Sequence, residues 1–97
     1  MKAIFISYNQ AYNEEIVELL DAHAQRGFTR WQDIEGRGSV DGEPHYSNHA
    51  WPVQNHAILT FVQEDKVKAI LDDLKAKDDA TPDLGLRAFV WSADQAF

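Results

Sequence analysis

The chain has 97 residues, of which 44% are hydrophobic and 11% aromatic, and its formal net charge is −7 at pH 7. This composition excludes a disordered chain and predicts one globular domain over residues 1–97. The acidic balance argues against nucleic acid as a partner, because non-specific binding to nucleic acid depends on Lys and Arg side chains that neutralise phosphates. The sequence contains no cysteine, which excludes disulfides, thiolate metal sites and a Cys nucleophile.

The first residues, MKAIFIS, contain one Lys and an apolar run that is too short for a signal peptide or a membrane span. We therefore expect a cytoplasmic protein with no membrane insertion.

The hydrophobic pattern predicts four strands and two amphipathic helices along the chain. The strands are expected at residues 2–8, 28–34, 55–62 and 86–91. The helices are expected at residues 14–26 and 64–77. The apolar stripe of the first helix reaches Ala24, and we place its left-handed cap at Gly27. The second helix is expected to be broken by the segment 78–83, which contains Pro82.

The resulting order, β-α-β-β-α-β, is typical of the ferredoxin-like α+β fold, an antiparallel sheet with two helices on one face. The strands are nevertheless apolar on both faces, so the face without helices is expected to meet another copy of the chain. The large aromatic residues of the strands are Trp31, Phe61, Phe89 and Trp91.

A long loop, residues 35–54, joins the second and third predicted strands and contains three glycines and two prolines. Loops of this length in a compact domain are usually functional or disordered. Imidazole and carboxylate groups together favour divalent transition metals, so we predict a metal site with four ligand residues. These are Glu43, His45, His49 and His56. The alternative is a polar loop whose histidines are solvated and bind nothing.

Two aromatic residues of the loop, Tyr46 and Trp51, are expected to contact a protein partner, because aromatic side chains often dominate the binding energy of interfaces. Ser47 and His49 are close in sequence, but no nucleophile, base and orienting group are arranged together. We therefore predict that the protein is not an enzyme.

The most specific local pattern begins with Gly27-Phe28-Thr29 and ends with Gly36-Arg37-Gly38. Glycines at the end of a strand permit positive φ or the close approach of a ligand. This strand, the long loop after it and the β-α-β-β-α-β order together resemble the PII-like signalling family, the nitrogen regulatory protein PII superfamily.

The resemblance implies a homotrimer whose sheets face inward and whose subunit clefts bind small ligands, often adenine nucleotides. It also implies that the long loop contacts a protein partner such as a transporter or a regulator. The ligand-binding residues that it implies are Thr29, Gly36, Arg37, Gly38 and Arg87. The family's second nucleotide segment is a Gly-Asp-Gly-Lys run, and here the matching stretch is Leu84-Gly85-Leu86-Arg87, so only Arg87 stands in for the lysine.

These observations predict a non-catalytic, PII-like trimeric sensor that binds a small ligand at subunit clefts and signals through residues 35–54. The alternative is a metal-binding protein of metal homeostasis or efflux control that uses the loop histidines. The sequence leaves the ligand open between a divalent transition metal, which the histidines favour, and an adenine nucleotide.

Overall fold

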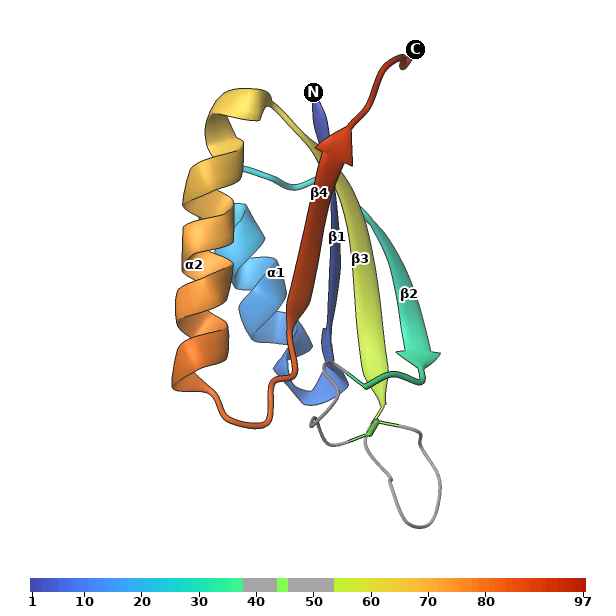
Figure 1. The fold of residues 1–97 in the computed structure, drawn as a ribbon, viewed down its shortest axis with the longest axis vertical. Helices are drawn as coiled ribbons and strands as arrows, with labels where there is room; N and C mark the ends of the chain where they lie inside the picture. Colours follow the sequence, from blue (N-terminus) through green and yellow to red (C-terminus); the bar gives the residue numbers. More distant parts are fainter. Residues whose placement is uncertain (38–43, 46–53) are drawn as a thin grey trace.

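The computed structural model describes residues 1–37, 44–45 and 54–97. These residues form one four-stranded antiparallel sheet with two helices on one face (Figure 1). The strands are β1 (Lys2–Asn9), β2 (Thr29–Ile34), β3 (Asn55–Val62) and β4 (Arg87–Ser92). The helices are α1 (Asn13–Ala22) and α2 (Val67–Ala80), preceded by the 3-10 turns η1 (Gln10–Tyr12) and η2 (Glu64–Lys66). The fold class predicted from the sequence is confirmed.

The strand order is β2-β3-β1-β4, so β2 and β4 are the two edges of the sheet. Ile6 of β1 lies opposite Ile58 of β3 and Ala88 of β4. Because side chains alternate along a strand, this register assigns the strand residues to one of two faces, except at the end of β2, where the register shifts between Trp31 and Ile34. We call the side covered by α1 and α2 the helix face and the other side the open face. The open face carries Ala3, Phe5, Ser7, Thr29, Trp31, Asn55, Ala57, Leu59, Phe61, Arg87, Phe89 and Trp91.

The hydrophobic core lies between the helix face and the two helices. Each helix contributes buried residues four positions apart, Ile16 and Leu20 from α1 and Ile70 and Leu74 from α2, as the helical period predicts. The other members of the core are Ile4, Ile6, Tyr8, Ile58, Val62, Leu84 and Leu86. Leu84 and Leu86 fix the connection between α2 and β4 to this core.

Helix α1 ends at Ala22, one turn before the predicted end. Ala24 adopts the left-handed conformation with φ 57°. The Gln25 N–H donates to Leu20 O at 2.9 Å, and the Ala24 N–H donates to Asp21 O at 2.9 Å, which is the Schellman pattern. The Gln25 side chain then donates to β3, to Thr60 Oγ1 at 2.7 Å. The prediction that Gly27 is the cap is therefore wrong, because contacts with β3 draw the chain away from the helix earlier.

Helix α2 continues to Ala80, three residues beyond the predicted end at residue 77, and it stops within the segment 78–83 that was expected to break it. Asp78 is part of the last turns, and its Oδ1 accepts a hydrogen bond from the Leu86 N–H at 3.1 Å. The helix ends directly before Thr81, which is extended with φ −129° and ψ 95°. This conformation is expected for the residue that precedes a proline, here Pro82.

Candidate functional site

The start of the long loop pairs with the middle of the loop beyond the end of β2. The Gly36 N–H donates to His45 O at 3.0 Å, and the His45 N–H donates to Gly36 O at 2.6 Å. This pair is an isolated antiparallel bridge outside the four strands. We call residues 35–37, 44–45 and 54–55 the loop base.

The side chain of His45 is buried in the loop base, with 4% of the residue exposed. Its Nδ1 lies 2.5 Å from Asn55 Oδ1, and Asn55 Nδ2 donates to Ser7 Oγ at 3.3 Å. Because Asn55 uses its amide nitrogen toward Ser7, its oxygen accepts, and His45 Nδ1 is the donor. In the neutral ring, His45 Nε2 then has no proton.

Two glycines permit close approach within this cluster. A Cβ on Gly36 would lie 2.5 Å from Asn55 Nδ2. A Cβ on Gly85 would lie 3.2 Å from His45 Cε1, and Gly85 has φ +60°. Both positions therefore require glycine, Gly85 for its backbone conformation as well as for space. The contact between His45 and Gly85 joins the loop base to the connection between α2 and β4.

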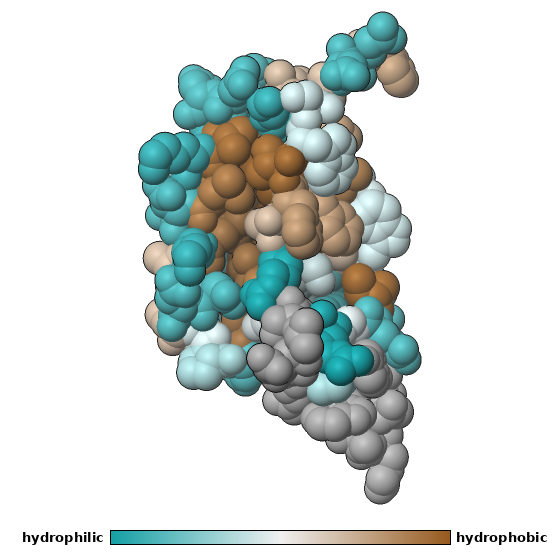
Figure 2. Space-filling model, in the orientation of Figure 1, coloured by the Kyte–Doolittle hydropathy of each residue, from teal (hydrophilic) through white to brown (hydrophobic). Residues whose placement is uncertain are grey.

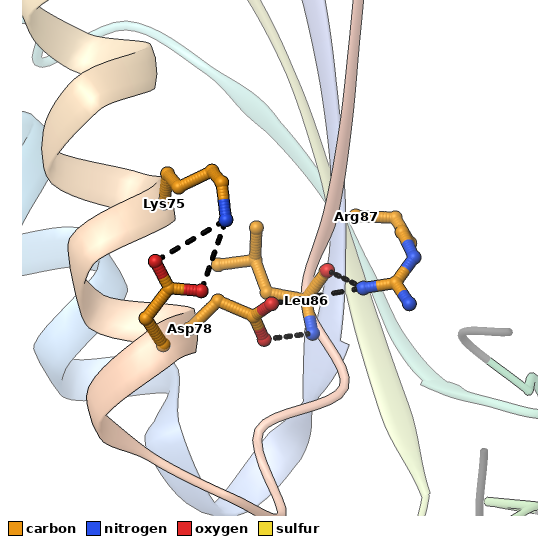
Figure 3. Close-up of polar contacts among 5 residues, drawn as sticks. Lys75, Asp78, Leu86 and Arg87 are labelled. Atoms are coloured by element: carbon orange, nitrogen blue, oxygen red, sulfur yellow. Dashed lines mark hydrogen bonds and ion pairs between the residues drawn. The ribbon is translucent and has the colours of Figure 1, made fainter.

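Asp78 and Arg87 organise this connection, residues 81–86, which we call the α2–β4 turn (Figure 3). Arg87 Nη1 donates to Leu86 O at 2.6 Å and lies 3.7 Å from Asp78 Oδ2. Lys75, one turn earlier in α2, binds Asp79 at 3.0 Å. Asp78 thus binds both the Leu86 N–H and the Arg87 guanidinium, and it fixes where β4 begins.

In the described part of the chain, two cavities border predicted ligand residues. A groove of about 340 Å³ lies between α2 and β4, and Figure 2 shows apolar surface there beside the hydrophilic side chains of α2. This groove is lined by Leu71, Leu74, Lys75, Asp78, Leu86, Arg87 and Ala88. A second cavity of about 320 Å³ is lined by Gln25, Gly27, Phe28, Thr29, Leu59, Thr60 and Phe61. Arg87 and Thr29 thus line separate depressions, at β4 and β2 respectively.

Apart from His45 and His56, the remaining ligand-binding, metal-binding and partner-binding residues predicted from the sequence divide into two groups. Gly36 and the exposed Arg37 lie together at the loop base. The other predicted residues lie outside the described residues: Gly38, Glu43, Tyr46, His49 and Trp51.

The structure does not bring His45 and His56 together, although both were predicted as ligands of one metal. His45 contacts Asn55 on the open face, whereas His56 lies on the helix face, where its ring meets Tyr8 edge to face. His56 Nδ1 accepts a hydrogen bond from the Asp33 N–H at 3.3 Å. Within residues 1–37, 44–45 and 54–97, no three His, Cys, Asp or Glu side chains could hold a metal ion together.

Two residues of the site were missed by sequence reasoning. Asn55 begins a mostly apolar strand, and a polar residue at that position was the available signal. Asp78 was assigned to a segment that breaks the helix, and no local pattern distinguishes it from the other acidic residues of α2.

Comparison with solved structures identifies where this fold occurs. The apo form of CPII, a nitrogen regulatory PII-like protein from Thiomonas intermedia K12, is 20% identical over 93% of this chain and 85% of that chain, with a TM-score of 0.72. CPII bound to ADP, AMP and bicarbonate is 21% identical over 93% of this chain and 82% of that chain, with a TM-score of 0.75. A protein of Thermus thermophilus described as PII-like and signaling is 23% identical, covering 93% and 82% of the two chains, with a TM-score of 0.65.

No family model and no curated protein matches the sequence. The solved structures show that the chain has the fold of the PII-like nitrogen regulatory proteins, which confirms at the level of the fold the resemblance found in the sequence. No helix in the described part of the chain is long and apolar enough to cross a membrane.

Proposed function

We propose that this protein is a non-catalytic, cytoplasmic regulator that binds an adenine nucleotide at clefts between the subunits of a homotrimer. The loop of residues 35–54 would then bind or release a protein partner, such as a transporter or a regulator, according to whether the nucleotide is bound. The observation that carries this proposal is the PII-like fold of the chain. In this chain the loop base and the α2–β4 turn meet where His45 lies against Gly85. CPII, which has this fold, binds ADP and AMP.

The positions of Thr29 and Arg87 favour a site between copies of the chain. Both belong to the open face, but Thr29 is on β2 and Arg87 is on β4, the opposite edges of the sheet. Three spacings between strands separate these edges, roughly 14 Å across the sheet. One small group of a ligand therefore cannot contact both residues of one chain. The β2 edge of one copy beside the β4 edge of another would place them in one cleft.

The open face also favours assembly. Four large aromatic side chains lie on it and are about half exposed: Trp31 (45%), Phe61 (51%), Phe89 (60%) and Trp91 (49%). An apolar surface of this kind usually marks an interface. A contact between two different edges is heterologous, and repeated around an axis it closes into a ring. The number three comes from the resemblance to PII-like proteins.

Two positively charged side chains, Arg87 and Arg37, could bind the phosphates of the nucleotide. Among the described residues, Arg87 uses Nη1 toward Leu86 O and Asp78, so its other guanidinium N–H groups could bind an anion at the mouth of the groove. Arg37 is exposed beside Gly36 at the loop base. The α2–β4 turn contributes little else, because Leu84 and Leu86 point into the core where the family pattern has glycines.

Calorimetric titration with ADP and AMP tests the proposal. We expect the wild type to bind, and Arg87→Ala to bind at least about tenfold more weakly, as for loss of a charged contact. Lys68→Ala is the matched control, because Lys68 is an exposed residue of α2 that binds only Asp72 among the described residues. Arg87→Lys keeps the positive charge but removes the guanidinium donors, so it separates the effect of charge from that of guanidinium hydrogen bonds. A wild type that binds neither nucleotide would contradict the proposal.

The metal-binding alternative stays a prediction for Glu43, His45 and His49, without His56. One observation favours it: the hydrogen bond between Nδ1 and Asn55 orients the His45 ring, and a contact of this kind is usual for a histidine that binds metal through its other nitrogen. Titration with Zn²⁺ of the wild type and of His49→Ala, with His56→Ala as a control, tests it. Equal affinity in the wild type and His49→Ala would contradict it.

A further inference from the structure

We propose that His45 is the positioning residue that couples the α2–β4 turn to the loop base, so that a change at the turn alters the bridge between Gly36 and His45. The inference deepens the proposed function and rests on it for the identity of the ligand. The coupling from Gly85 through His45 to Gly36 depends on contacts within one chain, so it can be tested without any ligand.

His45 is the point at which four segments of the chain meet. Its backbone binds Gly36 after β2, and its Nδ1 binds Asn55 at the start of β3. Asn55 in turn binds Ser7 of β1, and the His45 ring lies against Gly85 of the α2–β4 turn. A histidine that was only solvated in a polar loop would have none of these contacts.

The turn is tethered on both sides of Gly85. The Asn9 N–H donates to Leu84 O at 2.8 Å, and Asn9 Nδ2 donates to Asp83 O at 3.0 Å. On the other side, Asp78 holds the Leu86 N–H at 3.1 Å. Gly85 itself has a left-handed backbone between these two anchors. A ligand that draws Arg87 away from Asp78 therefore acts on the backbone two residues from Gly85.

The His45 ring lies against the Gly85 backbone and leaves no ordinary space there for a side chain, so a shift of this backbone toward the ring would displace the ring. A Cβ on Gly85 would lie only 3.2 Å from His45 Cε1, tighter than ordinary van der Waals contact. If the ring moves, its bond to Asn55 and the two backbone bonds to Gly36 must change with it. If the cluster has a second arrangement in which these contacts differ, a ligand that prefers one of the two shifts the balance between them.

The first arm of the test needs no ligand. Gly85→Ala pushes a methyl group toward the His45 ring, and site-resolved amide exchange then follows Gly36 and residue 45, the two donors of the bridge. We expect Gly85→Ala to accelerate exchange of both amides by about tenfold, within the usual range of coupling between sites. In a His45→Asn background, we expect Gly85→Ala to change the Gly36 amide less than about twofold.

His45→Asn is the informative variant, because the Asn amide nitrogen replaces Nδ1 as the donor to Asn55 but no ring atom reaches Gly85. A purely structural role of His45 would leave the effect of Gly85→Ala equal in both backgrounds, and that result would overturn the proposal. Slow exchange of amides in β3 verifies that every variant is folded.

The second arm adds ADP to the wild type and to His45→Asn. We expect both to bind ADP, and only the wild type to show altered exchange at Gly36. The same ADP response at Gly36 in both proteins would overturn the coupling role. An absence of ADP binding by the wild type would overturn the nucleotide proposal instead, and the Gly85→Ala arm would still decide the role of His45.

Discussion

The rings of Tyr8 and His56 lie edge to face across the β1–β3 pair, with centroids 6.2 Å apart and planes at 71°. Tyr8 is fully buried, and its hydroxyl donates to Asn13 Oδ1 at the start of α1. Burial raises the pKa of Tyr8 from 10.0 to about 12, while the positive charge of Arg30 lowers this pKa in part. The folded state therefore opposes ionisation of this phenol.

We predict that this phenol destabilises the fold at high pH. Its pKa is higher in the folded than in the unfolded chain, so its contribution is complete below pH 10 and is lost as the pH rises toward 12. The free energy of unfolding should fall by roughly 2–3 kcal/mol over this interval because of Tyr8 alone. Urea unfolding of the wild type and Tyr8→Phe between pH 9 and about 11.5 measures the difference between their slopes. Equal slopes would show that Tyr8 ionises as freely as in the unfolded chain.

The end of α1 gives a second prediction, on stability. Ala24 has φ 57°, a conformation that costs an L-residue with a Cβ roughly 1–2 kcal/mol. Ala24→Gly removes that strain but increases the entropy of the unfolded chain, so we expect a net gain of up to about 1 kcal/mol. Chemical denaturation measures it.

Gly27→Ala is the comparison for this prediction. Among the described residues, no atom lies within 4 Å of a Cβ built on Gly27. This variant should leave stability unchanged or raise it by up to about 1 kcal/mol. Loss of stability in Gly27→Ala, with none gained in Ala24→Gly, would restore the cap position that the sequence predicted.

The parts of the fold that could be predicted are those whose signal is local. The alternation of residues 2–8 and the helical stripe of Val67, Ile70, Leu71 and Leu74 depend only on periods of two and 3.6 residues. Those periods, together with the order of elements, were enough for the sheet and its two helices. The end of α1 was not predictable in the same way, because Gln25 is held by Thr60, 35 positions later.

The site was less predictable for the same physical reason. Gly36 was expected to approach a ligand, but the atom it approaches is Asn55 Nδ2. His45 was expected in a polar loop, but it is buried against Gly85, 40 residues away in the sequence. Each of these contacts joins segments that only the complete sheet brings together, and no window of sequence contains both partners.

We predict that Gly36→Ala destabilises the protein. Its Cβ would lie 2.5 Å from Asn55 Nδ2, so the Asn55 side chain must shift and weaken its bonds to Ser7 and His45. Forced rearrangement of a packed site costs about 1–3 kcal/mol. Thermal and chemical denaturation measure the loss, and Gly27→Ala is again the matched control. Equal stability of the two variants would contradict the packing described for the loop base.

The open face provides a prediction on assembly. Phe89→Asp places a charge among the exposed aromatic residues, and burial of an unpaired charge in an interface is costly. We expect the wild type to sediment as a trimer and Phe89→Asp as a folded monomer. Phe97→Asp is the control, because Phe97 is also exposed but lies outside the four strands. A wild type that is monomeric at micromolar concentration would contradict the interface, and a dimer would contradict the trimer.

The last prediction tests whether Thr29 and Arg87 of different copies form one site. Thr29→Ala and Arg87→Ala are each expected to abolish or strongly weaken ADP binding. When the two variants are unfolded, mixed in equal amounts and refolded together, mixed trimers contain clefts with an intact Thr29 from one copy and an intact Arg87 from the next. If assembly is random, about a quarter of the clefts are complete, so calorimetry should recover about a quarter of the wild-type stoichiometry at wild-type affinity. The separately refolded variants, mixed only afterwards, are the control and should show no recovery. If the co-refolded sample also fails to recover binding, while sedimentation confirms that mixed trimers form, both residues must act within one chain, and the geometry of the cleft proposed for this protein would be wrong.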